Sequence, residues 1–145
     1  MQIPVRVLDP ELPLPAPAHP GDAGYDLRAR EAAVLTPGGG RAAVPTGIAV
    51  AIPDGYCGLV LPRSGLALRH GVTCLNAPGL IDSGYRDEVR VILVNHDPVQ
   101  PFEVARGDRI AQLVIARAES VEWTVVDDLE NSIRGTGGFG STGRV

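Results

Sequence analysis

The sequence predicts an all-β fold, a compact distorted β-barrel or jelly-roll-like sandwich, with one short helix and a free C-terminal arm. Short β-branched runs recur along the chain, turn signals separate them, and 18 of the 145 residues are glycine and 13 are proline. This composition suits many short strands joined by turns. One core at this length buries about two-thirds of the unfolded surface, so residues 1–133 are expected to form one β-domain.

The apolar runs and the turn signals between them set the expected elements. Strands are predicted at residues 3–7, 47–52, 56–61, 88–95, 109–116 and 121–126, with weaker ones at 25–29 and 42–44. Turns are predicted at PGGG (37–40), PDG (53–55) and DP (97–98). The one helix is predicted at 64–70, where Ser64 is placed to cap its start and Gly71 to end it.

Charge and composition exclude several classes of function. The net charge is -4 and there is no basic run, which argues against a broad nucleic-acid surface. All 13 cationic side chains are arginine, so a Walker A loop and Schiff-base chemistry are excluded. We expect a cytoplasmic protein, because the sequence shows neither a membrane-length apolar stretch nor a secretory signal.

The cysteines and histidines predict no metal cage. Cys57 and Cys74 each lie in an apolar run, which favours two free thiols in the core over a disulfide. His19, His70 and His96 have no metal-ligand spacing with the cysteines, so no zinc site is expected.

The last residues, RGTGGFGSTGRV (134–145), form a glycine-rich arm with no apolar pattern. We expect it to be mobile until an anionic partner orders it, since its arginines, hydroxyls and backbone N–H groups suit a polyphosphate and Phe139 offers a flat face to a base. A plain disordered tail is the alternative. Gly135, Gly137 and Gly140 spell G-x-G-x-x-G, but a dinucleotide loop needs a helix after it and the sequence offers none.

Polar, glycine-containing segments interrupt the strands in five places. They are AGYDLRA (23–29), PRSGLAL (62–68), NAPGLIDSGYRDEV (76–89), GDRIAQLVI (107–115) and RGTGGFGSTG (134–143). Each has a structural explanation when taken alone: Asp26 or Asp108 can make a turn, Ser64 can cap a helix, and Arg63 can be a surface charge. Their shared order and spacing call for a common explanation.

In this order the five segments resemble the five signature motifs of the trimeric deoxyuridine triphosphatases (dUTPases), and the resemblance spans residues 23–143. It implies an all-β enzyme that uses Mg²⁺ and water attack on the α-phosphorus to hydrolyse dUTP to dUMP and pyrophosphate. Such an enzyme limits uracil incorporation into DNA and supplies dUMP for dTMP synthesis. The resemblance also implies a homotrimer with shared active sites.

The third segment carries the residues that the resemblance assigns to the nucleoside. Asn76, Leu80 and Ile81 correspond to positions that read the edge of uracil, and Tyr85 to the ring that lies against the sugar and excludes a 2′-hydroxyl. Asp82 corresponds to the carboxylate that orients and deprotonates the attacking water.

The second and fourth segments carry the residues implied for the phosphates. Arg63, Ser64 and Gly65 open the predicted helix, where free N–H groups favour an anion, and correspond to the α- and β-phosphate site. Gln112 corresponds to a glutamine of the phosphate region. Asp26 corresponds to a carboxylate that meets Mg²⁺ through water.

The resemblance also implies that residues 134–145 close over a neighbouring subunit's active site. Its expected contacts to the γ-phosphate and the base come from Arg134, Gly138, Phe139, Ser141 and Thr142, with Arg134 acting in trans like an arginine finger.

Two further positions, Arg90 and Asp87, are compared with the family separately. Arg90 corresponds to a position that contacts the ligand in relatives. Asp87 stands where the family more usually has glycine, and we expect its side chain to point outward.

Two alternatives stay open from the sequence. A dCTP deaminase shares the fold and the Pro-Arg-Ser start of the second segment, but the PRSGLAL and IDSGY sequences favour the pyrophosphatase. A non-catalytic module that only binds nucleotide predicts binding without turnover, and the presence of both Asp82 and Arg134 argues against it.

Overall fold

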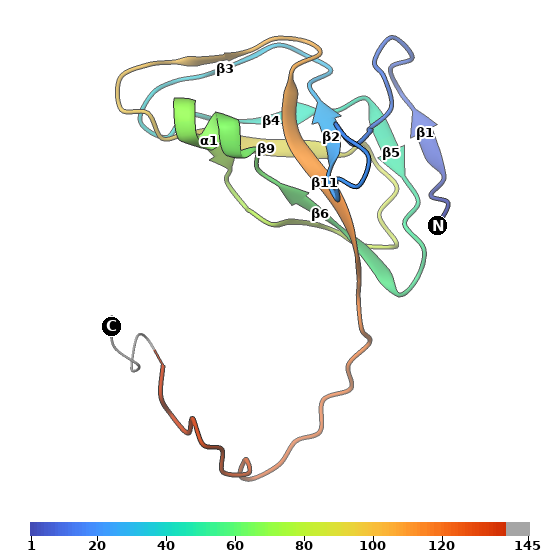
Figure 1. Cartoon of the computed structure of the whole chain (residues 1–145), viewed down its shortest axis with the longest axis vertical. Helices are drawn as coiled ribbons and strands as arrows, with labels where there is room; N and C mark the ends of the chain where they lie inside the picture. The colour runs from blue at the N-terminus through green and yellow to red at the C-terminus, as the bar shows by residue number, and fades with distance from the viewer. Residues whose placement is uncertain (139–145) are drawn as a thin grey trace.

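The computed structural model describes residues 1–138 and contains, within that range, short strands and one helix (Figure 1). The elements in chain order are β1 (Val5–Val7), β2 (Tyr25–Arg28), β3 (Ala33–Leu35), β4 (Arg41–Pro45), β5 (Ile48–Val50), β6 (Tyr56–Leu61), α1 (Ser64–His70), β7 (Val72–Cys74), β8 (Gly79–Ile81), β9 (Arg90–Asn95), β10 (Phe102–Val104) and β11 (Arg109–Arg117). The predicted all-β class with one short helix is confirmed.

The strands form antiparallel sheets. The largest has the order β2-β11-β6-β8, a second has the order β4-β9-β7, and two strand pairs, β1-β5 and β10-β3, complete the set among the described residues. Neighbours in a sheet are far apart in sequence: β2 and β6 flank β11. Since these sheets do not close on one another in residues 1–138, the fold is jelly-roll-like and not a closed barrel.

Alternating side chains of these sheets meet in one core. In β9 the exposed Arg90 and Ile92 alternate with the buried Val91 and Leu93, as expected for a sheet with one face inward. The largest fully buried side chains are Leu27, Leu35, Leu93, Ile110, Val44, Val72, Val89, Val91, Val104 and Asn95.

Both cysteines are free, as expected. Burial raises the pKa of the Cys74 thiol to about 11, whereas Cys57 is half-buried. Cys74 therefore behaves as a small, protonated core residue near neutral pH.

The predicted helix forms over 64–70, but Ser64 does not cap it. Arg63 occupies the N-cap position with extended backbone, and no side chain accepts a bond from the first turn. Ser64 is instead the first helical residue, so the first turn has no side-chain cap. Gly71 ends the helix as predicted, with a φ of 63° and its N–H donating to the carbonyl of Ala67 at 3.1 Å.

The strand predictions differ in outcome. The strand at 56–61 is confirmed to the residue, and those at 3–7, 47–52, 88–95 and 109–116 are confirmed with shifted ends. The strand at 121–126 is wrong, because these residues leave the sheets and pair with no described strand. The predictions lacked β3, β7, β8 and β10, each three residues long.

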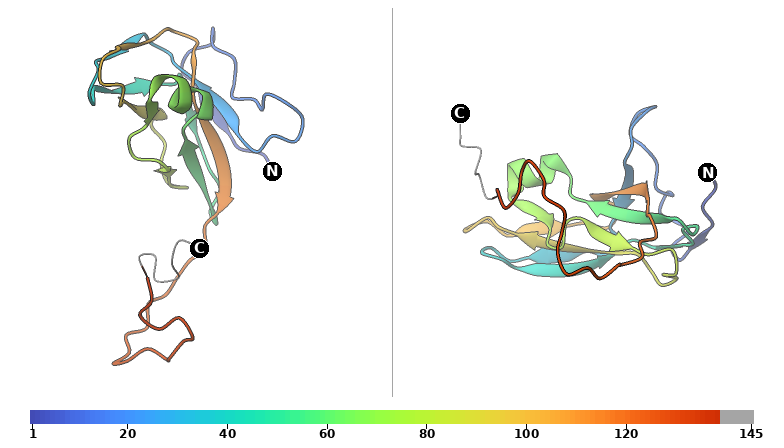
Figure 2. Two further views of the ribbon diagram at one scale, coloured as in Figure 1. Left: turned by 60° about the vertical axis from the view of Figure 1, so that its left-hand side comes forward. Right: turned by 90° about the horizontal axis from the view of Figure 1, so that it is seen from below.

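The chain turns away from the sheets after β11. Residues 118–138 run as an extended arm beneath the body, as two further views confirm (Figures 1 and 2). Trp123 is 88% exposed and Val125 is 96% exposed on this arm. Large apolar side chains exposed in this way are suited to packing on another surface. The one helix in residues 1–138 is too short to cross a membrane.

Candidate functional site

The β2-β11-β6 sheet brings two predicted site residues side by side. Asp26 on β2 pairs directly with Gln112 on β11, and Gln112 pairs on its other side with Leu61, the last residue of β6. The chain then continues through Pro62 into Arg63 at the start of α1. The register therefore gathers residues of the first, second and fourth sequence segments at one end of this sheet.

Asp26 is a buried carboxylate held by two guanidinium groups. Its Oδ1 lies 3.3 Å from Nε of Arg63, and its Oδ2 accepts a hydrogen bond from Nη1 of Arg109 at 3.1 Å. The Arg63 guanidinium also donates to the carbonyl of Arg109 at 3.2 Å. The three side chains form one ion-pair cluster, in which charge pairing offsets the cost of burial.

Arg109 is a site residue that the sequence reasoning missed. It begins β11 directly after the Gly107-Asp108 turn, and a lone strand arginine carries no local signal of its partner. Only the pairing of β11 with β2 reveals that its guanidinium faces Asp26.

The glycine of the first segment makes room for Gln112. A Cβ added at Gly24 would lie 3.0 Å from Oε1 of Gln112, so a larger residue would displace that amide. Gly24 therefore keeps the Gln112 side chain in place beside Asp26.

Asp26, the acidic side chain of this cluster, is suited to a metal ion that takes its other ligands from water and phosphates. It is not suited to a metal ion held by protein side chains alone. No group of three or more His, Cys, Asp or Glu residues within residues 1–138 could hold a metal. Oδ1 of Asp26, however, faces Arg63 at ion-pair distance and accepts no hydrogen bond from the described part of the chain. An oxygen with spare acceptor capacity fits Mg²⁺ that keeps its waters and takes further oxygens from phosphates.

The start of α1 lies next to this cluster. Ser64 is exposed, and Gly65 is followed one turn later by Arg69, whose Nη2 lies 2.8 Å from the position of a Cβ at Gly65. The N–H groups of this turn, which have no side-chain cap, are the donors expected to bind phosphates.

The third segment folds around β8, the edge strand of the same sheet. Among residues 1–138, Gly79–Ile81 pairs with β6 alone, so its other edge offers backbone donors and acceptors. Leu80 is 63% exposed, whereas Ile81 is buried and can contribute only its backbone. The Asn76 amide lies at the start of this strand, 3.3 Å from the position of a Cβ at Gly79.

Asp82 and Tyr85 follow β8 in a tight turn. The N–H of Tyr85 donates to the carbonyl of Asp82 at 3.1 Å, and the Tyr85 hydroxyl donates to the carbonyl of Glu88 at 3.0 Å. The Asp82 carboxylate is exposed, and within residues 1–138 it makes no hydrogen bond or ion pair. It is therefore available to a water molecule.

The phosphate-side residues and Asp82 lie at opposite ends of β6. Ile81 pairs with Gly58, so Asp82 continues toward Cys57, four residues before Leu61. Four residues of strand span about 13 Å, and Arg63 lies beyond Leu61. Asp82 and Arg63 of the same chain therefore do not lie close together.

Arg90 and Asp87 make different contacts in the structure. Arg90 is exposed and its Nη2 lies 3.6 Å from Oε2 of Glu88, while its expected contact with the ligand stays a prediction. Asp87 is exposed, as expected, and its Oδ1 accepts the N–H of Glu88 at 2.7 Å.

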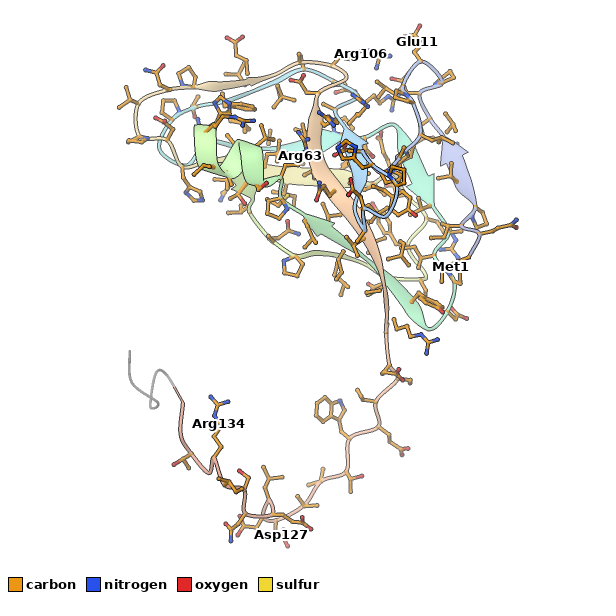
Figure 3. All side chains as sticks on the ribbon, viewed as in Figure 1. Met1, Glu11, Arg63, Arg106, Asp127 and Arg134 are labelled. Atoms are coloured by element: carbon orange, nitrogen blue, oxygen red, sulfur yellow. The ribbon has the colours of Figure 1, made fainter. Side chains whose placement is uncertain are left out.

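Arg134 and Gly138 lie on the arm. The Arg134 guanidinium donates through Nε to the carbonyl of Gly137 at 2.8 Å and lies far from Arg63 of the same chain (Figure 3). Phe139, Ser141 and Thr142 lie outside the described residues. The fold thus leaves Arg134 apart from the cluster that Asp26 organises.

A hollow of about 600 Å³ lies elsewhere, between the N-terminus, β5 and β11. Met1, Ile3, Leu14, Ile48 and Ile115 are among its apolar lining residues, so it suits an apolar segment better than a polyanion.

Comparisons with known proteins agree with the resemblance seen in the sequence. The family model described as dUTPase matches residues 10–143. A deoxyuridine 5'-triphosphate nucleotidohydrolase from Thermobifida fusca (strain YX) is 59% identical over 143 residues, which cover 99% of this chain and 79% of that protein. One from Corynebacterium glutamicum is 56% identical over 137 residues, 94% of this chain and 91% of the relative.

Solved structures share the fold as well. The Staphylococcus bacteriophage 80alpha dUTPase with dUpNHpp has a TM-score of 0.86 and 30% identity, over 98% of each chain. A mutant dUTPase from phage phi11 of S. aureus, described for its coordination of a structural Mg(II) ion, has a TM-score of 0.79 and 28% identity, over 90% of this chain and 100% of that one. On the family match, the identity to these relatives and the shared fold, the chain belongs to the dUTPase family.

Proposed function

We propose that this protein hydrolyses dUTP to dUMP and pyrophosphate with Mg²⁺, and so limits uracil incorporation into DNA and supplies dUMP for dTMP synthesis. The observation that carries the proposal is the exposed carboxylate of Asp82, which makes no hydrogen bond or ion pair within residues 1–138 and lies in a turn with Tyr85 directly after β8. The names of the relatives and the dUpNHpp complex of the phage enzyme support dUTP as the substrate.

The free edge of β8 suits recognition of uracil. Backbone groups of Leu80 and Ile81, together with the Asn76 amide, offer both donors and acceptors to the base. Uracil and cytosine have opposite polarity at the 4-position, so the wrong base would leave buried polar groups unpaired. Tyr85 lies against the deoxyribose and leaves no space for a 2′-hydroxyl.

The triphosphate binds the cationic end of the large sheet. Arg63, Ser64, Gly65 and Gln112 hold the α- and β-phosphates through the guanidinium, the uncapped N–H groups and the amide. The triphosphate competes with Asp26 for Arg63, while Arg109 continues to hold the other carboxylate oxygen of Asp26. Asp26 would hold Mg²⁺ through water, and the ion, when bound, neutralises charge on the phosphates.

In the chemical step, Asp82 removes a proton from a water molecule that attacks the α-phosphorus. A bond forms between the water oxygen and that phosphorus, and the bond from the phosphorus to the α,β-bridging oxygen breaks. Pyrophosphate leaves with the bonding electrons. A general base of this kind contributes about a hundred- to ten-thousand-fold in rate.

Complete sites form between copies in a homotrimer. The separation of Asp82 from Arg63 within one chain, about 13 Å or more along β6, supports a site that combines residues of different subunits. The exposed apolar side chains of the arm, Trp123 and Val125 among them, and the apolar hollow support an arm that crosses to a neighbour. Arg134, Gly138, Phe139, Ser141 and Thr142 then close over that neighbour's nucleotide.

The decisive experiment incubates the purified protein separately with dUTP and dCTP in the presence of Mg²⁺ and follows pyrophosphate and ammonia. We expect pyrophosphate and dUMP from dUTP, and no ammonia from either nucleotide. Ammonia from dCTP would instead identify a deaminase, and binding of dUTP without product would identify a nucleotide-binding module.

A further inference from the structure

Glu88 is a buried carboxyl group at the base of the loop that carries Asp82 and Tyr85. It is 6% exposed, and its Oε1 accepts the N–H of Gly47 at 2.8 Å in the turn between β4 and β5. Nη1 of Arg30 lies 3.4 Å from the same oxygen, and Nη2 of Arg90 lies 3.6 Å from Oε2. The carboxyl group thus joins the loop to an N–H group and two guanidinium groups.

Backbone bonds reinforce the same junction. The N–H of Val89 donates to the carbonyl of Ile48 at 2.8 Å, and the Thr46 hydroxyl and N–H donate to the carbonyl of Val89 at 2.6 and 3.2 Å. Gly47 has a φ of 76°, where other residues are strained, so the shape of this turn is defined. The loop that ends at Glu88 therefore rests on a rigid support.

Tyr85 is fixed to this support through Glu88 itself. Its hydroxyl donates to the Glu88 carbonyl at 3.0 Å, while its N–H bonds to Asp82. The tyrosine is held at both its backbone and the tip of its ring. Any displacement of Glu88 would move the ring and, with it, the turn that carries Asp82.

Burial of the Glu88 carboxyl group needs a physical reason. Burial of a charged group is unfavourable unless the charge is paired, and an apolar residue of similar volume often stabilises a fold equally well. An apolar residue here, however, would leave the Gly47 N–H unpaired and the loop without its link to the turn. A carboxyl group at position 88 is therefore explained if the site requires the loop that carries Asp82 and Tyr85 to be held in one position.

We propose that Glu88 is a positioning residue that sets the place of the Tyr85 ring and thereby the selection of deoxyribose over ribose. The proposal rests on the proposed function for the role of Tyr85. Glu88 is buried and acts through two bonds: its side chain accepts the Gly47 N–H, and its backbone carbonyl accepts the Tyr85 hydroxyl.

The test compares kcat and KM for dUTP and UTP in the wild type, Glu88→Ala and Glu88→Gln. We expect Glu88→Ala to raise KM for dUTP about tenfold, and to lower the preference for dUTP over UTP about tenfold, with a smaller change in kcat. Glu88→Gln should recover most of both values, because its amide oxygen still accepts the Gly47 N–H. Asp9→Ala is the matched control: it removes the other carboxylate near Arg30 but leaves the Gly47 bond intact.

Amide hydrogen exchange gives a second readout that does not depend on turnover. Exchange at Gly47 and Val89 should accelerate in Glu88→Ala and not in Asp9→Ala. Unchanged exchange there, or a wild-type preference for dUTP in a folded Glu88→Ala protein, would overturn the proposal. A wild type that does not hydrolyse dUTP contradicts the proposed function, and the exchange result then still decides whether Glu88 holds the loop.

Tyr85→Phe carries the test if Glu88→Ala does not fold. It removes only the hydroxyl bond to the Glu88 carbonyl, so the preference for dUTP over UTP should fall while the melting temperature changes little. An unchanged preference in Tyr85→Phe would contradict a role for Glu88 in placing the ring.

Discussion

The backbone N–H of Tyr85 donates to the carbonyl of Asp82 at 3.1 Å, so one turn carries both side chains at a fixed spacing. The turn begins where β8 ends, and β8 is held to β6 by its backbone. The role proposed for Asp82 as a base requires a carboxylate that water can reach and that stays in a defined position. The turn meets both conditions, because the Asp82 carboxylate is exposed and its backbone is anchored.

Asp82→Asn should lower kcat for dUTP by about a hundred- to ten-thousand-fold, because the amide cannot accept the proton of the attacking water. Binding of dUpNHpp, measured by calorimetry, should stay close to that of the wild type. Asp87→Asn is the control, since Asp87 is exposed nearby and its replacement still accepts the N–H of Glu88. Near-normal turnover in Asp82→Asn would remove Asp82 from the role of base.

Deletion of residues 134–145 should reduce kcat by about a hundredfold or more, because an arginine at developing phosphate charge contributes at least that much. The melting temperature should change little, since Arg134 is exposed and, within residues 1–138, the deleted segment bonds to the rest of the chain only at Ser132. Deletion of 144–145 alone, beyond the fifth motif, should retain activity. Full activity after the longer deletion would exclude the arm from catalysis.

Trp123 is the single tryptophan of the chain and is 88% exposed within one copy. If the arm packs on a neighbouring subunit, its fluorescence should be blue-shifted at assembly concentrations and shift red on dilution. Trp123→Ser should sediment as a smaller species in analytical ultracentrifugation. A trimer whose Trp123 emission is that of a fully hydrated indole would contradict the crossing arm.

Asn95 is fully buried, and its side chain meets three backbone groups. Nδ2 donates to the carbonyls of Leu35 and Gln100 at 3.1 and 2.8 Å, and Oδ1 accepts the N–H of Asp97 at 2.9 Å. Asn95→Ala leaves these groups unpaired, so we expect a loss of about 2–4 kcal/mol in the free energy of unfolding by urea. Asn131→Ala, on the exposed arm, should cost nothing measurable.

The sequence predicts those features whose cause is local. The strand at 56–61 and the end of the helix at Gly71 both depend on residues within a few positions along the chain. The segment at 121–126 has the same β-branched pattern but no partner strand in residues 1–138, and propensity alone cannot supply one. Likewise, Arg109 could not be assigned to the site, because its contact with Asp26 depends on pairing across 83 residues.

A last prediction concerns acid stability at the turn after β9. The N–H groups of Gln100 and Val99 both donate to Oδ1 of Asp97 at 2.8 Å and hold the pKa of this carboxyl below its usual value. A carboxyl whose pKa is lower in the folded state stabilises the fold above the pKa of the unfolded chain, and this stabilisation is lost as pH falls through the folded pKa.

The melting temperature of Asp97→Asn should therefore lie below that of the wild type by a constant amount from pH 7 to about pH 5, and the gap should close as the pH falls below about 4. At low pH the protonated aspartic acid and the asparagine are both neutral acceptors, so their bonds to Gln100 and Val99 become alike. Asp54→Asn, an exposed position whose carboxylate bonds to no residue in 1–138, is the control and should show no such gap. A gap for Asp97→Asn that is the same at pH 3 and pH 7 would mean that the negative charge of Asp97 does not contribute to this turn.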